Sequence, residues 1–170
     1  MSFHIRRAVP EDACTLAACH TACWQAAYQG IVPDEHLQNM PTALPQRTER
    51  FKQAIENGAH NYVPTCNNKI IGNLIFGESR DDDKPGVGEI GGFYLLQDYW
   101  GKGYGRQMMD FSIETLGRMG YNEIILWVFK ENTRARLFYE KYGFTPDGAQ
   151  KEITLGGQPL TEVRYVLHLS

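Results

Sequence analysis

A glycine-rich segment limits the folds that this chain can adopt. The stretch YWGKGYGRQMMDF, residues 99–111, places Gly101, Gly103 and Gly105 between the apolar run GGFYLL and a stretch with helical apolar spacing. Each glycine in a helix interior costs about 1 kcal/mol relative to alanine, so helices seldom begin with three of them. The pattern therefore predicts a strand, a tight turn and then a helix, with a backbone that another group must approach closely.

Length and charge restrict the class of the protein. With 170 residues, the chain is expected to form one domain, residues 1–170, with a core that needs no disulfide or metal. Its net charge of −3 gives no bias toward nucleic acid or anionic membranes. No apolar run approaches the ~20 residues that cross a bilayer, and MSFHIRRAVPEDA lacks a signal-peptide core. We expect a cytoplasmic protein without nucleic-acid or membrane partners. The sequence does not decide whether the chain forms a homodimer.

Four cysteines raise the question of a metal site. Cys14, Cys19 and Cys23 crowd one segment, with His20 between the last two, whereas Cys66 stands alone. No second Cys or His pair completes four ligands at a spacing typical of zinc sites. Small apolar packing residues in a reducing compartment are the simpler interpretation. We therefore expect no metal.

Hydrophobic periodicity predicts a mixed α and β chain with about seven strands. Alternating or continuous apolar runs indicate strands, and apolar residues at helical spacing indicate helices. The turn NN separates two expected strands as a hairpin, and Gly91–Gly92 interrupts the next strand like a β-bulge. The expected strands are FHIRRAV, NYVPTC, KIIGNLIFG, VGEIGGFYLL, EIILWVF, QKEITL and TEVRYVLHL. The expected helices lie near 10–28, 34–38, 44–57, 104–119 and 132–142.

The glycine segment is suited to bind an anion. The first N–H groups of a helix lack intrahelical partners, and the helix dipole favours negative charge there. The P-loop needs Ser or Thr after Gly-Lys, but Gly103 follows Lys102, and the dinucleotide fingerprint needs a different glycine spacing. The pyrophosphate loop of acetyl-CoA-dependent acyltransferases, x-x-G-x-G, fits. On the glycines alone, a turn that merely reverses the chain is an equal alternative.

A second segment decides between these alternatives. ENTRARLFYEKYGF follows the glycine segment after one expected helix and one expected strand. Together the two segments strongly resemble the GNAT superfamily of N-acetyltransferases, whose pattern runs R/Q-x-x-G-x-G/A and later Asn, Ala, Tyr and Gly-Phe. The matching positions here are Gly103, Gly105, Asn132, Ala135, Tyr139, Gly143 and Phe144.

The resemblance extends over the whole chain and implies a fold. We expect an α+β, GNAT-type fold, with a twisted, mostly antiparallel sheet of about seven strands flanked by four to five helices. The family's usual Arg or Gln falls on Trp100, which is a departure from the pattern. Because the loop binds mostly through main-chain N–H groups, we expect binding of acetyl-CoA to survive this change.

The resemblance also implies an acetyl-CoA site. Its pantetheine arm is expected along Phe93, Tyr94 and Leu95, with the Leu95 N–H polarising the thioester oxygen. Asn132 would bind the pantetheine, although it is also a good helix N-cap. The pyrophosphate is expected at the loop residues Gly101, Lys102, Gly103, Tyr104, Gly105 and Arg106.

Two residues are implied as proton donor and acceptor. Tyr139 stands where the family uses a phenol to protonate the departing thiolate, although periodicity alone places it on an apolar helix face. Glu89 is the only acid within its strand and matches the base of the histone acetyltransferase branch. An exposed strand carboxylate is an equal alternative, and a water chain could replace a dedicated base. Trp127 falls where the ribosomal-protein N-acetyltransferases have a Glu, and it cannot serve.

The acceptor of the acetyl group is a primary amine in this family, on a small molecule or on a peptide or protein. We expect its pocket between the first helices and the final strands, lined by Trp24 and Tyr28, for which core packing is a strong alternative. The run RDDD, residues 80–83, would attract cationic amines or form only solvated surface. A non-catalytic acyl-CoA-binding sensor or interaction module with the same fold is the other interpretation of the chain.

Overall fold

One mixed sheet organises the chain. The computed structural model describes residues 2–170, and its strand order is β1-β2-β4-β5-β6-β8-β7, with β3 paired to β2. The strands are β1 (Phe3–Arg7), β2 (Asn61–Cys66), β3 (Lys69–Ile70), β4 (Gly72–Glu78), β5 (Gly88–Leu95), β6 (Glu123–Phe129), β7 (Thr145–Leu155) and β8 (Gln158–His168). The helices are α1 (Ala13–Ala27), α2 (Asp34–Asn39), α3 (Leu44–Glu56), α4 (Tyr104–Arg118) and α5 (Thr133–Glu140).

The expected α+β, mostly antiparallel class is confirmed. Every strand pair is antiparallel except β5 with β6, which is parallel and spans only Gly88–Ile90 against Ile124–Leu126. The sheet has eight strands rather than seven because Ile71 separates the two-residue β3 from β4. β7 also begins at Thr145, earlier than its apolar pattern indicates, because it continues across a register shift between Pro146 and Gln150.

Two local predictions about the strands are confirmed. Asn67 and Asn68 adopt φ of 49° and 64°, the left-handed values that a two-residue hairpin turn requires. The register between β4 and β5 shifts between Ile75 and Phe76, so that Gly91 is the additional residue on β5. A β-bulge therefore lies in the strand that leads to the glycine segment.

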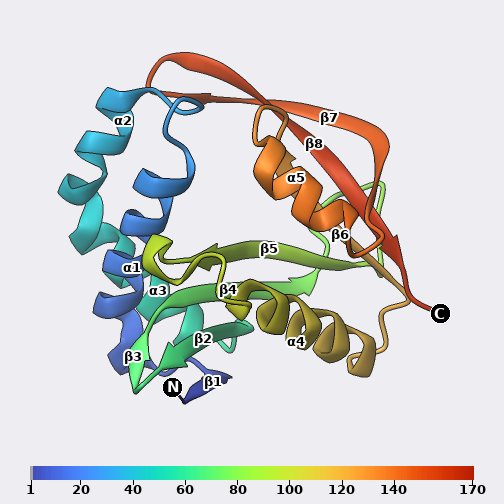
Figure 1. Cartoon of the computed structure of the whole chain (residues 1–170), viewed down its shortest axis with the longest axis horizontal. Helices are drawn as coiled ribbons and strands as arrows, with labels where there is room; N and C mark the ends of the chain where they lie inside the picture. Colours follow the sequence, from blue (N-terminus) through green and yellow to red (C-terminus); the bar gives the residue numbers. More distant parts are fainter. Residues whose placement is uncertain (1) are drawn as a thin grey trace.

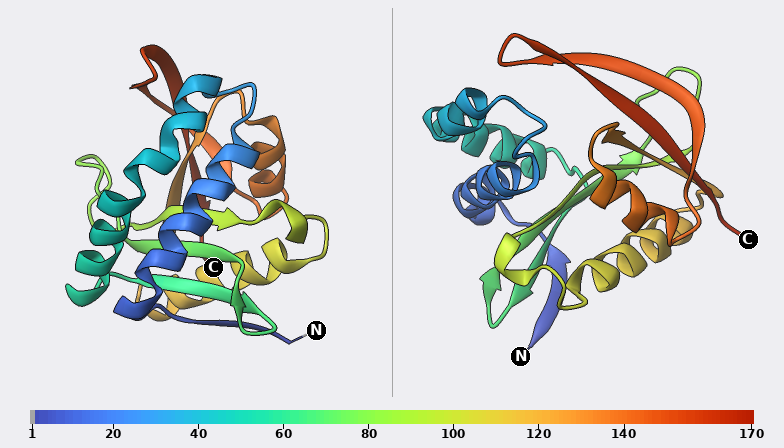
Figure 2. Two further views of the ribbon diagram at one scale, coloured as in Figure 1. Left: turned by 90° about the vertical axis from the view of Figure 1, so that its left-hand side faces the viewer. Right: turned by 45° about the horizontal axis from the view of Figure 1, so that its top comes forward.

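Helices cover both faces of the sheet (Figures 1 and 2). On one face, α4 and α5 enclose the largest core cluster, which includes Leu74, Met108, Met109 and Leu126. On the other face, α1 and α3 pack around Leu16 and Val63 in a second cluster. No helix within residues 2–170 is long and apolar enough to span a bilayer.

The long β7–β8 hairpin reaches back to the N-terminal helices (Figure 1). At its turn, an added Cβ on Gly156 would lie 3.1 Å from the Cβ of His36 in α2, so the hairpin tip is in close contact with that helix. Phe129 and Leu160 continue this contact into a small apolar cluster with Tyr28. The hairpin and the end of α1 are thereby packed together in one apolar cluster.

Candidate active site

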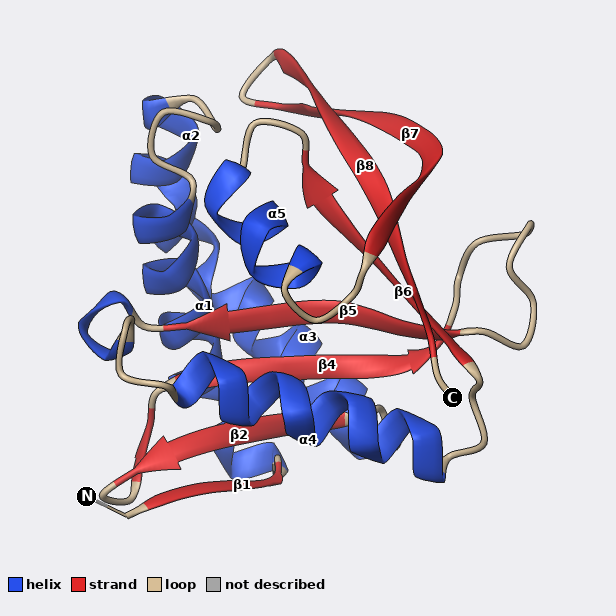
Figure 3. Cartoon of the chain, turned by 45° about the vertical axis from the view of Figure 1, so that its right-hand side comes forward, coloured by secondary structure: helices blue, strands red, loops and turns tan. Residues whose placement is uncertain are grey.

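The central strands separate at the β-bulge and leave an open strand edge. β5 pairs with β6 only as far as Ile90, and Figure 3 shows the two strands diverging beyond that point. The Leu96 N–H donates to the carbonyl of Ile71, the residue before β4, at 2.8 Å, and Tyr94 lies opposite Asn73. Alternation along an antiparallel pair therefore directs the N–H groups of Phe93 and Leu95 away from β4, into the gap.

A cleft of about 1070 Å³ occupies this gap and runs past the glycine segment. Gly101, Gly103, Gly105 and Arg106 line it. Gly103 has φ of +83° at the N-cap of α4, a left-handed conformation that glycine adopts without strain. A Cβ built on Gly103 meets no protein atom within 4 Å, so its missing side chain keeps space in the cleft open.

Two of the six loop residues lie outside the cleft, contrary to the expected set. The ring of Tyr104 stacks on Phe3 at 4.9 Å and is buried, because the first turn of α4 directs this position toward the sheet. The ammonium group of Lys102 lies 5.6 Å from the ring centroid of Tyr99. Neither side chain lines the cleft, so Tyr104 could contribute there only through its main-chain N–H.

Trp100 ties the loop to the open strand. Its indole Nε1–H donates to the carbonyl oxygen of Leu95 at 2.8 Å. The guanidinium carbon of Arg134 lies 3.5 Å from the centroid of the Trp100 ring, a cation–π contact. The residue that departs from the family pattern therefore has a structural role, and it brings a positive charge from α5 to the edge of the cleft.

Asn132 caps α5 and also lines the cleft. Its Oδ1 accepts a hydrogen bond from the Ala135 N–H at 3.2 Å, as expected of an N-cap residue. This bond uses the amide oxygen and leaves the Nδ2 donor for a ligand. The capping role and the expected pantetheine contact are thus compatible.

Tyr139 in α5 lines the cleft from the face of the sheet that α4 and α5 cover. It is partly buried, and its ring packs against Phe93 at 6.4 Å and Phe144 at 6.1 Å. Burial, followed by interaction with Tyr94, raises the pKa of the Tyr139 phenol. The phenol is therefore protonated at neutral pH, as a proton donor must be. Periodicity alone predicts that Tyr139 lies on an apolar helix face. In the structure, its side chain packs against the core and also lines the cleft.

Glu89 lines the cleft, but it is neither exposed nor unpaired. Its side chain is 5 % exposed, so the alternative of an exposed strand carboxylate is wrong. Arg80 donates three hydrogen bonds to it: from the main-chain N at 2.9 Å, from Nη2 at 2.7 Å and from Nε at 3.4 Å. Both groups line the cleft at the end opposite the glycine segment.

Trp24 and Tyr28 line the cleft and also pack in an apolar cluster. Their rings are 4.7 Å apart, and Tyr28 meets Phe129 at 5.0 Å. Burial, followed by interaction with Tyr94 and then with Tyr139, raises the pKa of Tyr28 well above its usual value. Three phenols from α1, β5 and α5 therefore lie near one another where the strands separate.

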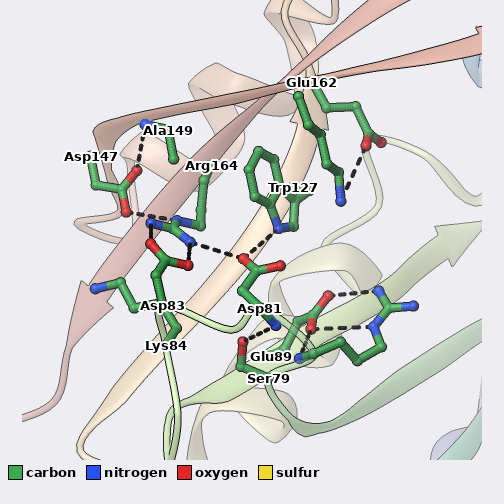
Figure 4. A network of polar contacts seen from close by, with 12 residues as sticks. Ser79, Asp81, Asp83, Lys84, Glu89, Trp127, Asp147, Ala149, Glu162 and Arg164 are labelled. Carbon is green, nitrogen blue, oxygen red and sulfur yellow. Dashed lines mark hydrogen bonds and ion pairs between the residues drawn. The ribbon is translucent and has the colours of Figure 1, made fainter.

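Two acids of the run 80–83, Asp81 and Asp83, form ion pairs with an arginine of β8. Arg164 is 5 % exposed, and its guanidinium forms ion pairs with Asp81 at 2.9 Å, Asp83 at 2.7 Å and Asp147 at 2.7 Å (Figure 4). Asp81 also accepts a hydrogen bond from the Trp127 indole at 3.0 Å. The run is therefore a structural element that fixes the β4–β5 loop to β8.

Sheet register brings further charged residues to the cleft that the sequence analysis missed. Trp127 lies opposite Arg164, Phe129 opposite Glu162, and Glu162 opposite Lys151. Glu162 and Lys151 line the cleft together with Arg80. Alternating charges in TEVRYVLHL mark one polar face of β8, but only the register reveals that this face borders the cleft.

The cysteine cluster has no metal-site geometry. Cys19 and Cys23 are buried, at 6 % and 1 % exposure, and Cys14 is exposed. Within residues 2–170, no group of three or more His, Cys, Asp or Glu side chains is arranged to hold a metal ion.

Comparisons with known proteins agree with this geometry. The family model described as "Acetyltransferase (GNAT) family" matches residues 21–144. The chain is 24 % identical to the uncharacterized N-acetyltransferase YuaI of Bacillus subtilis, over 96 % of this chain and 98 % of that protein. The PaiA N-acetyltransferase of Thermoplasma acidophilum, solved with coenzyme A, matches with a TM-score of 0.73 at 21 % identity, covering 95 % and 98 % of the two chains. YncA of Salmonella typhimurium, a putative acetyltransferase solved with its cofactor acetyl-CoA, matches with a TM-score of 0.73 at 20 % identity, covering 100 % and 95 %.

Proposed function

The chain belongs to the GNAT family of N-acetyltransferases, which use acetyl-CoA, and we propose that it transfers the acetyl group to a primary amine by direct attack within a ternary complex. The observation that carries the proposal is the open edge of β5 beyond Ile90, which lies between the glycine segment and Tyr139 along one cleft. An amine and a thioester can meet in that cleft without an intermediate carrier on the protein.

The donor end binds acetyl-CoA mainly through the main chain. The outward N–H groups of Phe93 and Leu95 form hydrogen bonds with the pantetheine arm, as an added strand would. The N–H groups that open α4 bind the pyrophosphate, and Arg106 adds positive charge. The Leu95 N–H stabilises the negative charge that develops on the thioester oxygen. Coenzyme A bound to PaiA and acetyl-CoA bound to YncA support this assignment.

Proton transfer completes the reaction. The amine nitrogen forms a bond to the carbonyl carbon, the carbon–sulfur bond breaks, and Tyr139 donates its proton to the departing thiolate. The nitrogen, which still carries two protons, then releases one of them, and this proton restores the Tyr139 phenol directly or through water. The raised pKa keeps the phenol protonated until negative charge develops on sulfur. Before attack the acceptor loses a proton, which Glu89 accepts directly or through water. Arg80 holds the Glu89 carboxylate through three hydrogen bonds, so a path through water fits the contacts better.

Thiol release from acetyl-CoA in the presence of a panel of amines tests the proposal. Tyr139→Phe keeps the ring and its packing but removes the acid, and general acid catalysis contributes typically about 10²–10⁴-fold. We expect kcat to fall by about that factor, with acetyl-CoA affinity little changed. Tyr62→Phe is the matched control, because Tyr62 packs against Phe76 at 5.0 Å and does not line the cleft.

Two results would contradict the proposal in different ways. Acetyl-CoA binding without thiol release for any amine would favour the non-catalytic acyl-CoA-binding module. The second result is a kcat of Tyr139→Phe within a few-fold of wild type under conditions where chemistry limits the rate. It would show that Tyr139 contributes packing and is not the proton donor.

A further inference from the structure

The acceptor end of the cleft carries two ion pairs whose members lie at different depths. Arg80 pairs with Glu89 at 2.7 Å, and Lys151 approaches Glu162 at 3.5 Å. The carboxylates are 5 % and 18 % exposed, whereas the cations are 76 % and 41 % exposed. In both pairs the cation therefore lies nearer to solvent, and the carboxylate lies deeper in the cleft.

The two carboxylates are not equally available to a ligand. Glu89 accepts three hydrogen bonds from Arg80, so most of its acceptor capacity is used. Glu162 has one ionic contact, at 3.5 Å, which is longer than the ~2.7–2.9 Å of a charge-assisted hydrogen bond. Its strand position, opposite Phe129, places it beside Tyr28, whose pKa it helps to raise. Glu162 is thus the carboxylate that can bind an incoming ammonium group.

The two cations keep donors for a second group on the same ligand. Arg80 binds Glu89 through Nε and Nη2, so the donors on Nη1 are not used in that ion pair. Lys151 lies 4.1 Å from the centroid of the Trp127 ring, and its three N–H donors are only loosely engaged by Glu162. An acceptor with several positive charges would be repelled by both cations, which lie nearer to solvent than their carboxylate partners.

We propose that the acceptor is a small zwitterion, a primary amine that also bears a carboxylate and an apolar side chain, as in an aromatic or aliphatic amino acid. This inference rests on the acetyltransferase function proposed above. Glu162 binds the ammonium group, and Arg80 and Lys151 bind the carboxylate. Trp24, Tyr28 and Ile31 supply the apolar wall of the pocket.

Matched pairs of compounds test the role of the carboxylate. Thiol release is measured with phenylalanine against phenethylamine, leucine against 3-methylbutylamine and tryptophan against tryptamine, with spermidine and a lysine-rich peptide as cationic acceptors. We expect the amino acid to exceed its decarboxylated partner about tenfold or more in kcat/KM, because hydrogen bonds between charged groups carry that difference. Equal or higher rates with the decarboxylated amines, or a preference for spermidine or the peptide, would overturn the inference and keep the transferase function. Thiol release with none of the compounds would overturn both.

Two variants connect the preference to the named cations. Arg80→Gln and Lys151→Gln should each lower, about tenfold, the ratio of kcat/KM for the preferred amino acid to kcat/KM for its decarboxylated amine, because this ratio cancels any loss through Glu89 or the fold. Arg118→Gln is the control, because Arg118 is 73 % exposed and pairs with Glu114 on the surface of α4. Equal losses with both members of a compound pair would contradict the assignment, since damage to Glu89 or to the fold does not distinguish them.

Discussion

The two ends of the cleft are constructed differently. The donor end consists of main-chain N–H groups and glycines from two short segments, 93–106 and 132–139. The acceptor end consists of side chains from α1, the β4–β5 loop and four strands, which only the sheet register brings together. A ligand common to a whole family can be bound by a conserved backbone shape, whereas the acceptor side can change by substitution of single side chains.

The largest expected effect tests whether backbone shape controls the donor end. Gly103→Ala places a methyl group in the space that opens toward the cleft, next to the helix N–H groups. We expect acetyl-CoA affinity to fall about 10²-fold, equivalent to about 3 kcal/mol. Isothermal titration calorimetry with acetyl-CoA measures this directly.

Gly58→Ala is a close control for that variant. Gly58 and Gly103 both have φ of +83°, and neither has a protein atom within 4 Å of an added Cβ. Both substitutions therefore carry the same left-handed strain of about 1–2 kcal/mol, but only one lies in the cleft. Equal acetyl-CoA affinities in the two variants would show that the glycine segment serves the fold and not the ligand.

The same difference explains what could be predicted from the sequence. The strand, turn and helix around Gly103, the cap at Asn132 and the mixed α and β content follow from local rules, since each depends on residues close together in the chain, whereas the α+β, GNAT-type class came from the family resemblance. Glu162 and Lys151 could not be found in this way, because their place in the cleft depends on pairing between β6, β8 and β7. The run 80–83 was ambiguous for the same reason: its partner Arg164 is distant in sequence.

A pH-dependent stability is expected on the acceptor side. His20 in α1 contacts Tyr94 at 4.8 Å, and burial, followed by the charge of Arg47, lowers its pKa from 6.5 to about 4. Between these values the unfolded chain binds a proton that the folded chain excludes. Stability from this group is therefore complete above pH 6.5 and is lost as the pH falls toward 4, by on the order of 2–3 kcal/mol.

Urea unfolding of wild type and His20→Phe between pH 7 and pH 4 measures this contribution. The phenyl ring keeps the aromatic contacts and cannot titrate, so the variant should lose less stability over this range. His20→Leu is a second variant, in case the larger ring does not fit. Identical pH dependence of the unfolding free energy in wild type and in both variants would show that protonation of His20 does not destabilise the fold.

A smaller kinetic effect is expected at Glu89. Glu89→Gln keeps the shape and removes the charge, so kcat/KM at pH 7 should fall about tenfold and recover partly as the pH rises, because solvent then supplies free amine. Glu123→Gln is the control, since Glu123 pairs with Lys84 and does not line the cleft. Parallel pH profiles with equal plateaus would remove Glu89 from proton transfer and leave it as the partner of Arg80.

The smallest effect compares two tryptophans, one at each end of the cleft. Trp100 donates from its indole to the Leu95 carbonyl at 2.8 Å, and Trp127 donates to Asp81 at 3.0 Å. Replacement by Phe removes one hydrogen bond in each case, which is worth about 1 kcal/mol or about fivefold in affinity.

Trp100→Phe should weaken acetyl-CoA binding and leave the KM for the acceptor unchanged, because it loosens the strand edge that binds the donor. Trp127→Phe should raise the KM for the acceptor alone, because it loosens Asp81 and the loop that carries Arg80. If either variant altered both ligands equally, the two ends would be mechanically coupled through β5 and β6, and the division between a backbone-built donor end and a side-chain-built acceptor end would fail.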